Sequence, residues 1–450
     1  MTGRKNSMAP RAFVTTLVAL SLGACGWFGG DSKPKQAYDD GGRERISILT
    51  STQTLDADSS IGNLSIVLPK PYKNGNWALP GGNAAHSVQH LEMSDQLSLA
   101  WRRNIGRGNG KYRRVISGPV AADGRIFTVD VEGDVSAVSL ANGDLLWSAE
   151  FRNSDERSDV GFGGGVAYSS DVVYATSGFG FLAAFNAATG QELWRYNAGV
   201  PFRGAPTVDA GRIFVVTHDN QMLAINAADG TLVWDQVGIA ESAGMLGAAT
   251  PAYDNGTVVV ALSSGELIAM LGGNGRILWQ DTLSSSRRLT PLATLADIDG
   301  EPVIDRGKVY ALSHAGSMVA IDMRSGERSW EADIAGVNMP WIAGNFAFLT
   351  TIDGQVVSVM LGDGKVRWVS QLQRFLDQDK RRDLIKWNGP ILAGNRLLVT
   401  STHGYALSLS PYTGEVLSGI ELPAGSSTAP IVVDGTLVVL TDEGELLAYR

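Results

Sequence analysis

A repeated unit that ends on tryptophan constrains this chain more than any other feature. Its clearest copy runs from Pro206 to Trp234, and equivalent units recur roughly every 40 to 50 residues. The units end at Trp101, Trp147, Trp194, Trp234, Trp279, Trp330, Trp368 and Ser418. Units of this kind cannot fold independently, so the chain is expected to place them side by side.

Each unit carries small residues at fixed distances before its final position. Four residues before it, from Trp147 onward, stand Gly143, Gly190, Gly230, Gly275, Gly326, Gly364 and Gly414. Ten residues before it stand Ala137, Ala184, Ala224, Ala269, Ala320, Ser358 and Ser408. Glycine, asparagine or aspartate also recurs fourteen and twenty-three residues before it, as at Gly133 and Gly124. These residues adopt left-handed backbone conformations most easily, so the columns predict three tight turns, and the β-rich runs between them predict four strands per unit.

Four-stranded units repeating at this interval are the signature of a β-propeller, in which each blade buries both faces against its neighbours. An indole on the outer strand is expected to lie over the next blade, where a small side chain leaves room. Residues 430–450 carry only the first three strands of a unit, and the missing outer strand lies at Leu99 to Trp101. The sequence therefore predicts an all-β, eight-bladed propeller, closed by pairing of its N- and C-terminal strands, which removes the exposed sheet edges.

The first 25 residues have the pattern of a bacterial lipoprotein signal peptide. Basic residues between Arg4 and Arg11 precede an apolar stretch, Phe13 to Leu22, that is short for a membrane span. Small residues then lead to Cys25, the only cysteine in the chain. We expect cleavage before Cys25 and its lipidation. Because Gly26 replaces the aspartate typical of inner-membrane retention, we expect an anchor in the outer membrane, on the periplasmic face.

The sequence divides into a signal peptide at residues 1–24, a tether at residues 25–76 and the propeller at residues 77–450. The tether is rich in Gly, Ser, Asp and Lys and lacks the repeat, although a short ordered piece is expected near Ile61 to Val67. The net charge is −9, and removal of the signal peptide makes it more negative, because the charged residues there are all basic. An acidic surface repels phosphate, so nucleic acid is not an expected partner.

The joints between units vary in length, whereas the units themselves are nearly constant. In an antiparallel blade these joints emerge on the same face as the middle hairpin, and variable loops on a rigid scaffold are common binding sites. Three joints stand out, namely residues 235–250, with Met245 and Leu246; residues 280–301, with Arg287, Arg288, Asp297 and Asp299; and residues 369–389, with Leu372, Phe375 and Leu376 at helical spacing. Each joint either covers a blade edge or binds a partner.

One joint resembles a segment of the BamB family, the propeller lipoproteins of the β-barrel assembly machinery (BAM complex) of the bacterial outer membrane. Residues 295–303, LADIDGEPV, are similar to the family's Leu-x-Asp-Val-Asp-x-x-Pro-Val segment. The resemblance covers the lipoprotein signal and all eight blades, and it implies that Asp297 and Asp299 dock on the periplasmic domains of BamA, the barrel-forming subunit. A second family contact, a Leu-x-Leu-Arg loop, matches residues 243–246, AGML, in which Met245 and Leu246 are apolar and the arginine is absent.

The main enzymatic alternative is a quinoprotein dehydrogenase, because that family has the same repeat and uses pyrroloquinoline quinone with calcium. Such enzymes are larger and have an adjacent-cysteine disulfide beside the cofactor, whereas the one cysteine here lies in the lipoprotein signal. Residues 297–300 resemble half of a calcium loop without its remaining oxygen ligands. The five histidines are scattered, and no Gly-x-Ser-x-Gly motif occurs. We expect no cofactor, no metal and no catalytic residue.

These observations predict a non-catalytic scaffold lipoprotein that binds BamA and other BAM subunits and assists the folding and insertion of β-barrel outer membrane proteins. Unfolded barrel precursors are expected as further partners, and Cys25 as the membrane anchor. The predicted partner-binding residues are Met245, Leu246, Arg287, Arg288, Leu295, Asp297 and Asp299. A quinoprotein and a stand-alone periplasmic ligand-binding propeller are the alternatives.

Overall fold

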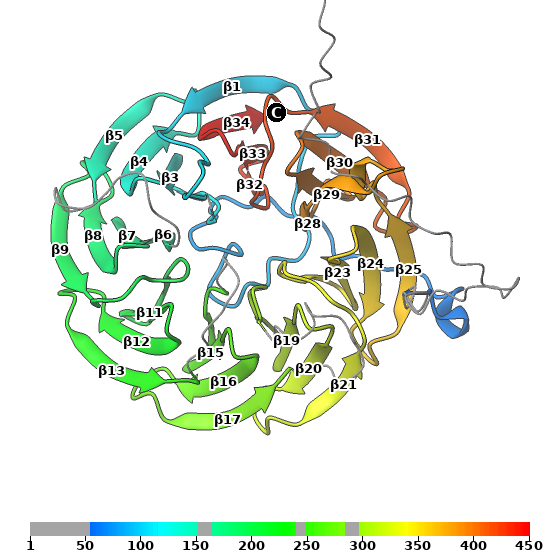
Figure 1. Cartoon of the computed structure of the whole chain (residues 1–450), viewed down its shortest axis with the longest axis horizontal. Helices are drawn as coiled ribbons and strands as arrows, with labels where there is room; N and C mark the ends of the chain where they lie inside the picture. The colour runs from blue at the N-terminus through cyan, green and yellow to red at the C-terminus, as the bar shows by residue number, and fades with distance from the viewer. Residues whose placement is uncertain (1–54, 115, 152–163, 240–248, 284–296) are drawn as a thin grey trace, which may run out of the picture. The chain divides into compact units, whose positions relative to one another are not determined.

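The computed structural model describes residues 55–114, 116–151, 164–239, 249–283 and 297–450. Residues 55–450 form one compact unit, and Cys25 lies outside the described residues. In this unit the repeats fold as a β-propeller whose blades follow one another around a ring (Figure 1). None of the described helices has the length and apolarity needed to cross a membrane.

Each repeat forms one four-stranded antiparallel sheet, with its strands in chain order from the centre outward. Blades 1 to 4 are β2 (Val120–Ala122), β3 (Arg125–Val129), β4 (Asp134–Ser139) and β5 (Leu145–Glu150); β6 (Gly164–Ser169), β7 (Val172–Ser177), β8 (Phe181–Asn186) and β9 (Glu192–Asn197); β10 (Thr207–Asp209), β11 (Arg212–Val216), β12 (Gln221–Asn226) and β13 (Leu232–Val237); β14 (Ala252–Asp254), β15 (Thr257–Ala261), β16 (Glu266–Leu271) and β17 (Ile277–Thr282).

The next three blades follow the same order. They are β18 (Val303–Asp305), β19 (Lys308–Leu312), β20 (Met318–Asp322) and β21 (Arg328–Ala332); β22 (Trp341–Ala343), β23 (Phe346–Thr350), β24 (Gln355–Met360) and β25 (Val366–Gln371); β28 (Trp387–Ala393), β29 (Arg396–Ser401), β30 (Tyr405–Leu409) and β31 (Val416–Glu421). A separate two-stranded hairpin, β26 (Phe375–Asp377) and β27 (Arg382–Leu384), lies in the joint between blades 6 and 7.

Blade 8 joins the two ends of the repeat region. Its inner strands β32 (Ile431–Val433), β33 (Thr436–Leu440) and β34 (Glu445–Tyr449) come from the C-terminus, and its outer strand β1 (Leu99–Asn104) precedes blade 1 in the chain. Trp101 pairs with Ala448 in this sheet. The predicted eight-bladed propeller and its closure are thus confirmed.

The first turn of each blade is tight because its residues accept left-handed backbone angles. In blade 1 the turn residues Asp123 and Gly124 have φ of 51° and 73°. Positive φ at both central residues is the geometry of a two-residue hairpin turn that matches the twist of its strands. The need for positive φ explains why Gly, Asn or Asp recurs at the turn positions of the repeat.

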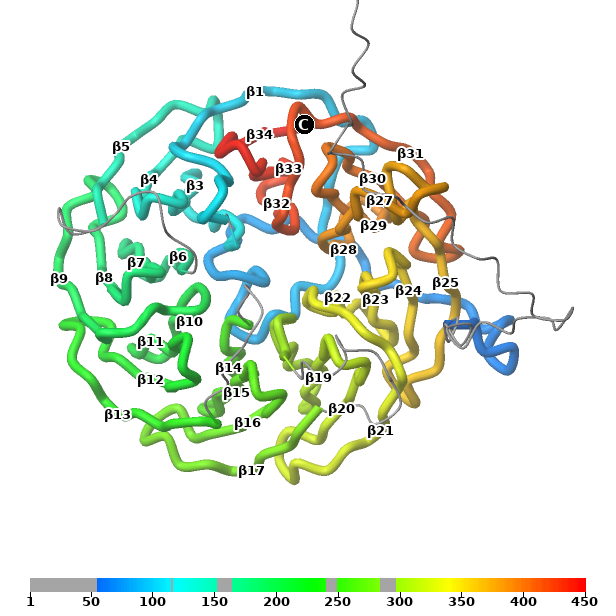
Figure 2. The backbone as a smooth tube through the Cα atoms, viewed as in Figure 1, coloured from blue at the N-terminus to red at the C-terminus, as the bar shows by residue number. Residues whose placement is uncertain are grey.

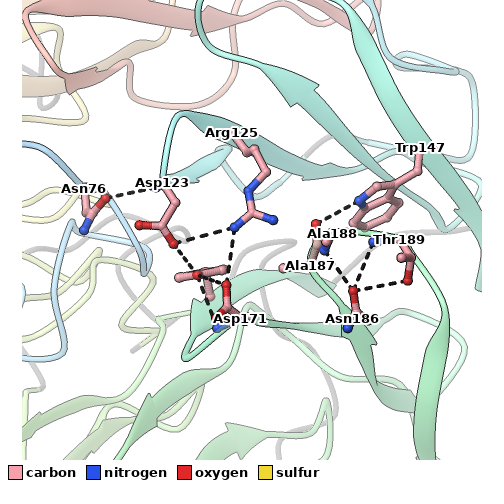
Figure 3. A network of polar contacts seen from close by, with 10 residues as sticks. Asn76, Asp123, Arg125, Trp147, Asp171, Asn186, Ala187, Ala188 and Thr189 are labelled. Atoms are coloured by element: carbon pink, nitrogen blue, oxygen red, sulfur yellow. Dashed lines mark hydrogen bonds and ion pairs between the residues drawn. The ribbon is translucent and has the colours of Figure 1, made fainter.

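The tryptophans join seven of the eight blades to the next, and blade 7 has Ser418 in place of the tryptophan. The Trp147 indole nitrogen in blade 1 donates to the Ala187 carbonyl of blade 2 at 2.9 Å (Figure 3). Equivalent bonds of 2.7 to 3.2 Å join Trp101 to Leu140, Trp194 to Ala227, Trp234 to Gly272, Trp279 to Met323, Trp330 to Leu361, and Trp368 to Pro411. Each of these bonds satisfies a donor that would otherwise be costly to bury.

The residue that leaves room for the indole is a glycine, and here the sequence-based expectation needs correction. The small residue Ala137 faces Trp147 within the same blade, as its cross-strand partner. The close approach to blade 2 is at Gly190, where an added Cβ would lie 2.6 Å from the Trp147 ring. Two columns of small residues therefore serve the indole, one inside the blade and one across the junction.

Residues 72–93, called the inner belt below, run around the centre of the ring (Figure 2). Main-chain bonds join the belt to inner strands or the turns beside them in six blades, and a side-chain bond joins it to a seventh. They pair Asn74 with Asp434, Trp77 with Ala121, Ala78 with Tyr168, Ala84 with Tyr253, Ala85 with Ile304, and Leu91 with Leu392 and Gly394, and the Trp341 indole adds a bond to Gln89. The belt bonds near the first turns of the blades, so it lies at the face opposite the variable joints.

The chain before the belt also lies against the propeller. A 3₁₀ turn, η1 (Ser59–Ile61), is capped by Asp58, and Ile61 and Ile66 are buried, in keeping with the short ordered piece expected there. The Asp58 amide donates to the Val366 carbonyl at 2.8 Å. The compact unit therefore begins at Leu55, before residue 77, the boundary expected from the sequence.

Candidate functional site

The joints from each outer strand to the next inner strand, together with the turns between second and third strands, form what we call the connection face. A cavity of about 750 Å³ is lined mainly by the inner strands and by joints of this face. Ionisable side chains in its wall include Asp299, Glu301 and Lys386, and Trp77 and Gly81 of the inner belt complete its lining. Because the belt bonds to the opposite ends of the inner strands, it forms the floor of this cavity.

The two predicted aspartates lie in a buried charge cluster. Arg203 Nη2 approaches Asp297 Oδ1 and Oδ2 at 3.1 and 3.3 Å and Asp299 Oδ1 at 3.5 Å. The side chains of Arg203, Asp297 and Asp299 are only 3%, 1% and 7% exposed. The carboxylates thus already have a cation within the chain, and removing one partner would leave a buried charge uncompensated.

Backbone contacts fix the same segment against blades 4 and 5. The Ile298 amide donates to the Leu262 carbonyl at 3.4 Å, and the His314 amide donates to the Asp297 carbonyl at 3.1 Å. The Ile298 side chain is fully buried between the two blades. Residues 297–299 are therefore held from both sides, with Asp299 directed at the cavity.

Two carboxyl groups of the cavity wall bind protons tightly. Burial raises the pKa of Asp299 to about 7, assisted by repulsion from Asp297 and opposed by Arg203. Burial also raises the pKa of Glu301 to about 7, opposed only by a bond to its own backbone. These groups change charge near neutral pH, so the wall can take up a proton or recognise a positively charged group.

Two of the joints predicted to bind a partner meet at one turn of blade 4. The Ile239 amide, in the first joint, donates to Glu266 Oε2 at 3.0 Å. In the second joint, the Leu283 amide donates to the Gly265 carbonyl at 2.8 Å, and Ile298 bonds to Leu262. The described ends of residues 235–250 and 280–301 therefore flank residues 262–266 on the connection face.

The structure describes none of the other predicted partner-binding residues. Met245, Leu246, Arg287, Arg288 and Leu295 lie outside the described residues. Their role in binding a partner stays a prediction, as does that of Asp297 and Asp299. Arg203 was missed from the sequence, because it stands 94 residues before Asp297 in a joint with no unusual composition.

The third joint differs from its expectation. Leu372, Phe375 and Leu376 have helical spacing, but residues 375–384 form the hairpin β26–β27. Phe375 pairs with Leu384, and the Leu372 amide bonds to the Gly354 carbonyl of blade 6. Strand pairing between β26 and β27 satisfies part of the backbone of this joint.

The donor set does not fit a calcium ion at Asp297 and Asp299. A cation bound there would lie beside the positively charged Arg203 guanidinium, which already pairs with both carboxyl groups. In the described ranges, no group of three or more His, Cys, Asp or Glu side chains is arranged to hold a metal. The calcium ion of the enzymatic alternative therefore has no matching donor set at Asp297 and Asp299.

Comparison with known proteins decides the family. The sequence model described as outer membrane protein assembly factor BamB matches residues 131–370, more than half of the chain. The chain belongs to the BamB family. The resemblance noted from the sequence is thus confirmed.

Individual proteins of the BamB family are similar to the chain in sequence and in fold. The outer membrane protein assembly factors BamB of Yersinia pestis and Escherichia coli K12 are 24% and 26% identical to the chain, covering 78% and 77% of it and 88% and 87% of their own lengths. The crystal structure of BamB from Moraxella catarrhalis superimposes with a TM-score of 0.66 at 18% identity, covering 79% of this chain and all of that one.

The same fold occurs in enzymes. A quinohemoprotein alcohol dehydrogenase from Comamonas testosteroni superimposes with a TM-score of 0.64 at 16% identity, covering 84% of this chain and 81% of that one. A likeness at this identity reflects the propeller alone and carries no activity. Family membership therefore favours the assembly factor over the quinoprotein.

Proposed function

We propose that this protein is a non-catalytic scaffold of the BAM complex, which binds BamA through its connection face and assists the folding and insertion of β-barrel outer membrane proteins. Cys25 would carry the lipid that anchors it to the periplasmic face of the outer membrane. The observation that carries the proposal is the meeting of two variable joints at the blade 4 turn, in a chain of the BamB family.

In this proposal the buried aspartates act by positioning the docking segment. Arg203 holds Asp297 and Asp299 inside the wall, so residues 297–299 follow one course along blades 4 and 5. We expect the residues that precede them in the chain, Arg287, Arg288 and Leu295, to bind BamA together with Met245 and Leu246. A fixed segment loses little conformational entropy on binding, which favours affinity.

Site-specific photo-crosslinking tests the docking face. Val237, at the start of the first joint, and Val67, before the inner belt, are 71% and 73% exposed. A photoreactive residue at either position in the full-length lipoprotein is equally accessible. We expect BamA to crosslink from position 237 and not from position 67. Equal crosslinking from both positions, or none from position 237, would show that the connection face is not the docking face.

A substitution pair tests the aspartates separately. The double variant Asp297→Asn with Asp299→Asn removes both charges while keeping the side-chain volumes. We expect recovery of BamA by co-purification to fall about tenfold, which corresponds to the lower end of the cost of disrupting a buried charge pair. Thermal unfolding of the same preparation shows whether the propeller remains folded. Wild-type recovery from a folded variant would remove both aspartates from the docking site.

A further inference from the structure

Exposed apolar side chains recur at the two positions before the final residue of the repeat. Those with the largest side chains are 39% to 53% exposed, and they are Leu99, Leu145, Leu146, Leu193, Leu232, Val233, Ile277, Leu278, Val416 and Leu417. They lie on β31, β1, β5, β9, β13 and β17, the outer strands of six consecutive blades (Figure 1). We call this set the apolar rim.

A β-bulge shapes the rim on each blade. In blade 1, Leu145 pairs with Val138 and Trp147 pairs with Ala137, so Leu146 has no cross-strand partner. The same shift occurs beside Trp234 and Trp279. Because a bulge interrupts regular pairing, it discourages continuous addition of another strand. The rim can therefore offer short contacts to a chain segment without absorbing that segment into the sheet.

Blade 6 shows how such a position is covered. Its equivalent residue, Val366, is only 7% exposed, and Leu55 packs against the cluster that contains it. The Asp58 amide donates to the Val366 carbonyl at 2.8 Å. Arg367, the bulge residue, donates through Nε to the Leu64 carbonyl at 2.9 Å. A segment of this chain that includes the short η1 turn, residues 55–64, thus covers an outer strand through one main-chain bond, one side-chain bond and apolar contact.

Blade 5 marks the other end of the rim. Its two equivalent positions are the polar residues Arg328 and Ser329. Arg328 forms ion pairs with Asp281 and Glu331 at 2.7 Å. This blade provides a natural comparison, with the same strand and bulge but no apolar pair.

We propose that the apolar rim binds extended, alternately apolar segments of unfolded barrel precursors, at the positions equivalent to those that residues 55–64 cover on blade 6. The proposal rests on the function proposed above and names the surface used for the substrate. Membrane β-strands are segments of about 10 residues with apolar side chains at every second position. One such segment can place apolar side chains beside the rim residues of a blade and donate an amide to the carbonyl that is equivalent to that of Val366 on blade 6.

Rim residues on six blades provide several contact sites, which suits a protein that holds an unfolded precursor. Each contact is small and therefore weak, but six neighbouring blades can engage successive segments of one precursor, which raises the overall affinity without any new kind of contact. A bilayer is the less favoured occupant. The cover seen on blade 6 is polypeptide, and the net charge of −9 opposes binding to anionic lipid.

The test uses the full-length protein and a labelled synthetic peptide of about 10 residues that alternates Val or Tyr with Ser or Thr. Binding is followed by fluorescence anisotropy. The variant Leu146→Ser with Val233→Ser and Leu278→Ser removes one exposed side chain from each of three blades, so it should remain folded. We expect this variant to bind at least about fivefold more weakly than the wild type. The single variant Ser329→Leu should bind more tightly.

A second peptide of the same composition, with its apolar residues in one block, is the control for alternation, and we expect it to bind more weakly. Equal affinity of the wild type and the triple variant for the alternating peptide would overturn the proposal. So would rim-dependent self-association in ultracentrifugation, or rim-dependent flotation with phosphatidylglycerol vesicles, without peptide binding. Co-purification with BamA separates the two proposals. Unchanged peptide binding with intact co-purification rejects the rim alone, whereas wild-type protein that fails to recover BamA rejects the proposed function.

Discussion

At the scale of the residue, the buried ionisable side chains of the cavity wall differ in whether a partner of opposite charge lies nearby. The Arg203 guanidinium pairs with both Asp297 and Asp299 inside the protein. For Glu301, in contrast, no positive charge offsets the effect of burial, which raises the pKa of this side chain to about 7. Its charged form is therefore unfavourable in the folded state, and its neutral form is favoured.

The stability of the protein should depend on pH through Glu301. The unfolded state releases this proton near the ordinary pKa of 4.5, and the folded state releases it near 7, so the Glu301 contribution is full below the lower value and is lost as pH rises to the upper one. Glu301→Gln stays neutral throughout. We expect it to match the wild type at pH 4 and to be more stable at pH 8, by up to about 3 kcal/mol. Chemical unfolding at both pH values measures this difference.

A surface carboxylate provides the comparison. Glu421 is exposed at the end of β31, so Glu421→Gln should leave the pH dependence of stability at its wild-type slope. If the curves of Glu301→Gln and the wild type run parallel between pH 4 and pH 8, burial does not shift the Glu301 proton in the way described.

At the scale of the blade, stability depends on the junction between each indole and the next glycine. Gly190 has a φ of 73° and lies where an added Cβ would be 2.6 Å from the Trp147 ring. The junction therefore requires glycine for two reasons, namely backbone angle and space. Most other junctions repeat this arrangement, which explains why the two columns recur together along the sequence.

A pair of substitutions separates these two reasons. Gly211 has the same φ of 73°, but an added Cβ there would meet nothing within 4 Å. Gly211→Ala should lower the free energy of unfolding by about 1 kcal/mol through backbone strain alone. Gly190→Ala should cost a further 1 to 3 kcal/mol, roughly, because the indole must move. Urea unfolding followed by tryptophan fluorescence gives both values. Equal costs would mean that the indole yields freely and does not fasten the blades.

For the whole molecule, two long-range features hold the ring together. Blade 8 joins strands from both ends of the repeat region, and the inner belt bonds to inner strands and turns around the ring. The belt also buries large side chains. Leu91 is fully buried, and the Trp77 ring stacks on the Trp341 ring with 6.1 Å between the ring centroids. A propeller without the belt would keep its blades but lose this central bracing and the floor of its cavity.

Truncation tests the belt. A chain that starts at residue 55 keeps every described contact, and we expect it to unfold at the wild-type temperature. A chain that starts at residue 94 lacks the belt and should unfold at a clearly lower temperature. Leu91→Ala is a smaller change, and we expect the cavity that it creates to lower the free energy of unfolding by about 2 to 5 kcal/mol. Leu64→Ala, at an exposed position, should have little effect. Circular dichroism during heating measures all four, and a wild-type melting temperature for the chain lacking the belt would contradict this account.

The sequence by itself determined the blades, their number and their closure, because turn glycines, strand patterns and tryptophans act over short distances and repeat. The meeting of Arg203 with Asp297 and Asp299 was decided only by the tertiary structure, since residues 94 positions apart become neighbours through the curvature of the ring. The path of the inner belt was decided in the same way. Its hydrogen bonds go to successive blades and not to its own neighbours, so it has no period that a sequence could reveal.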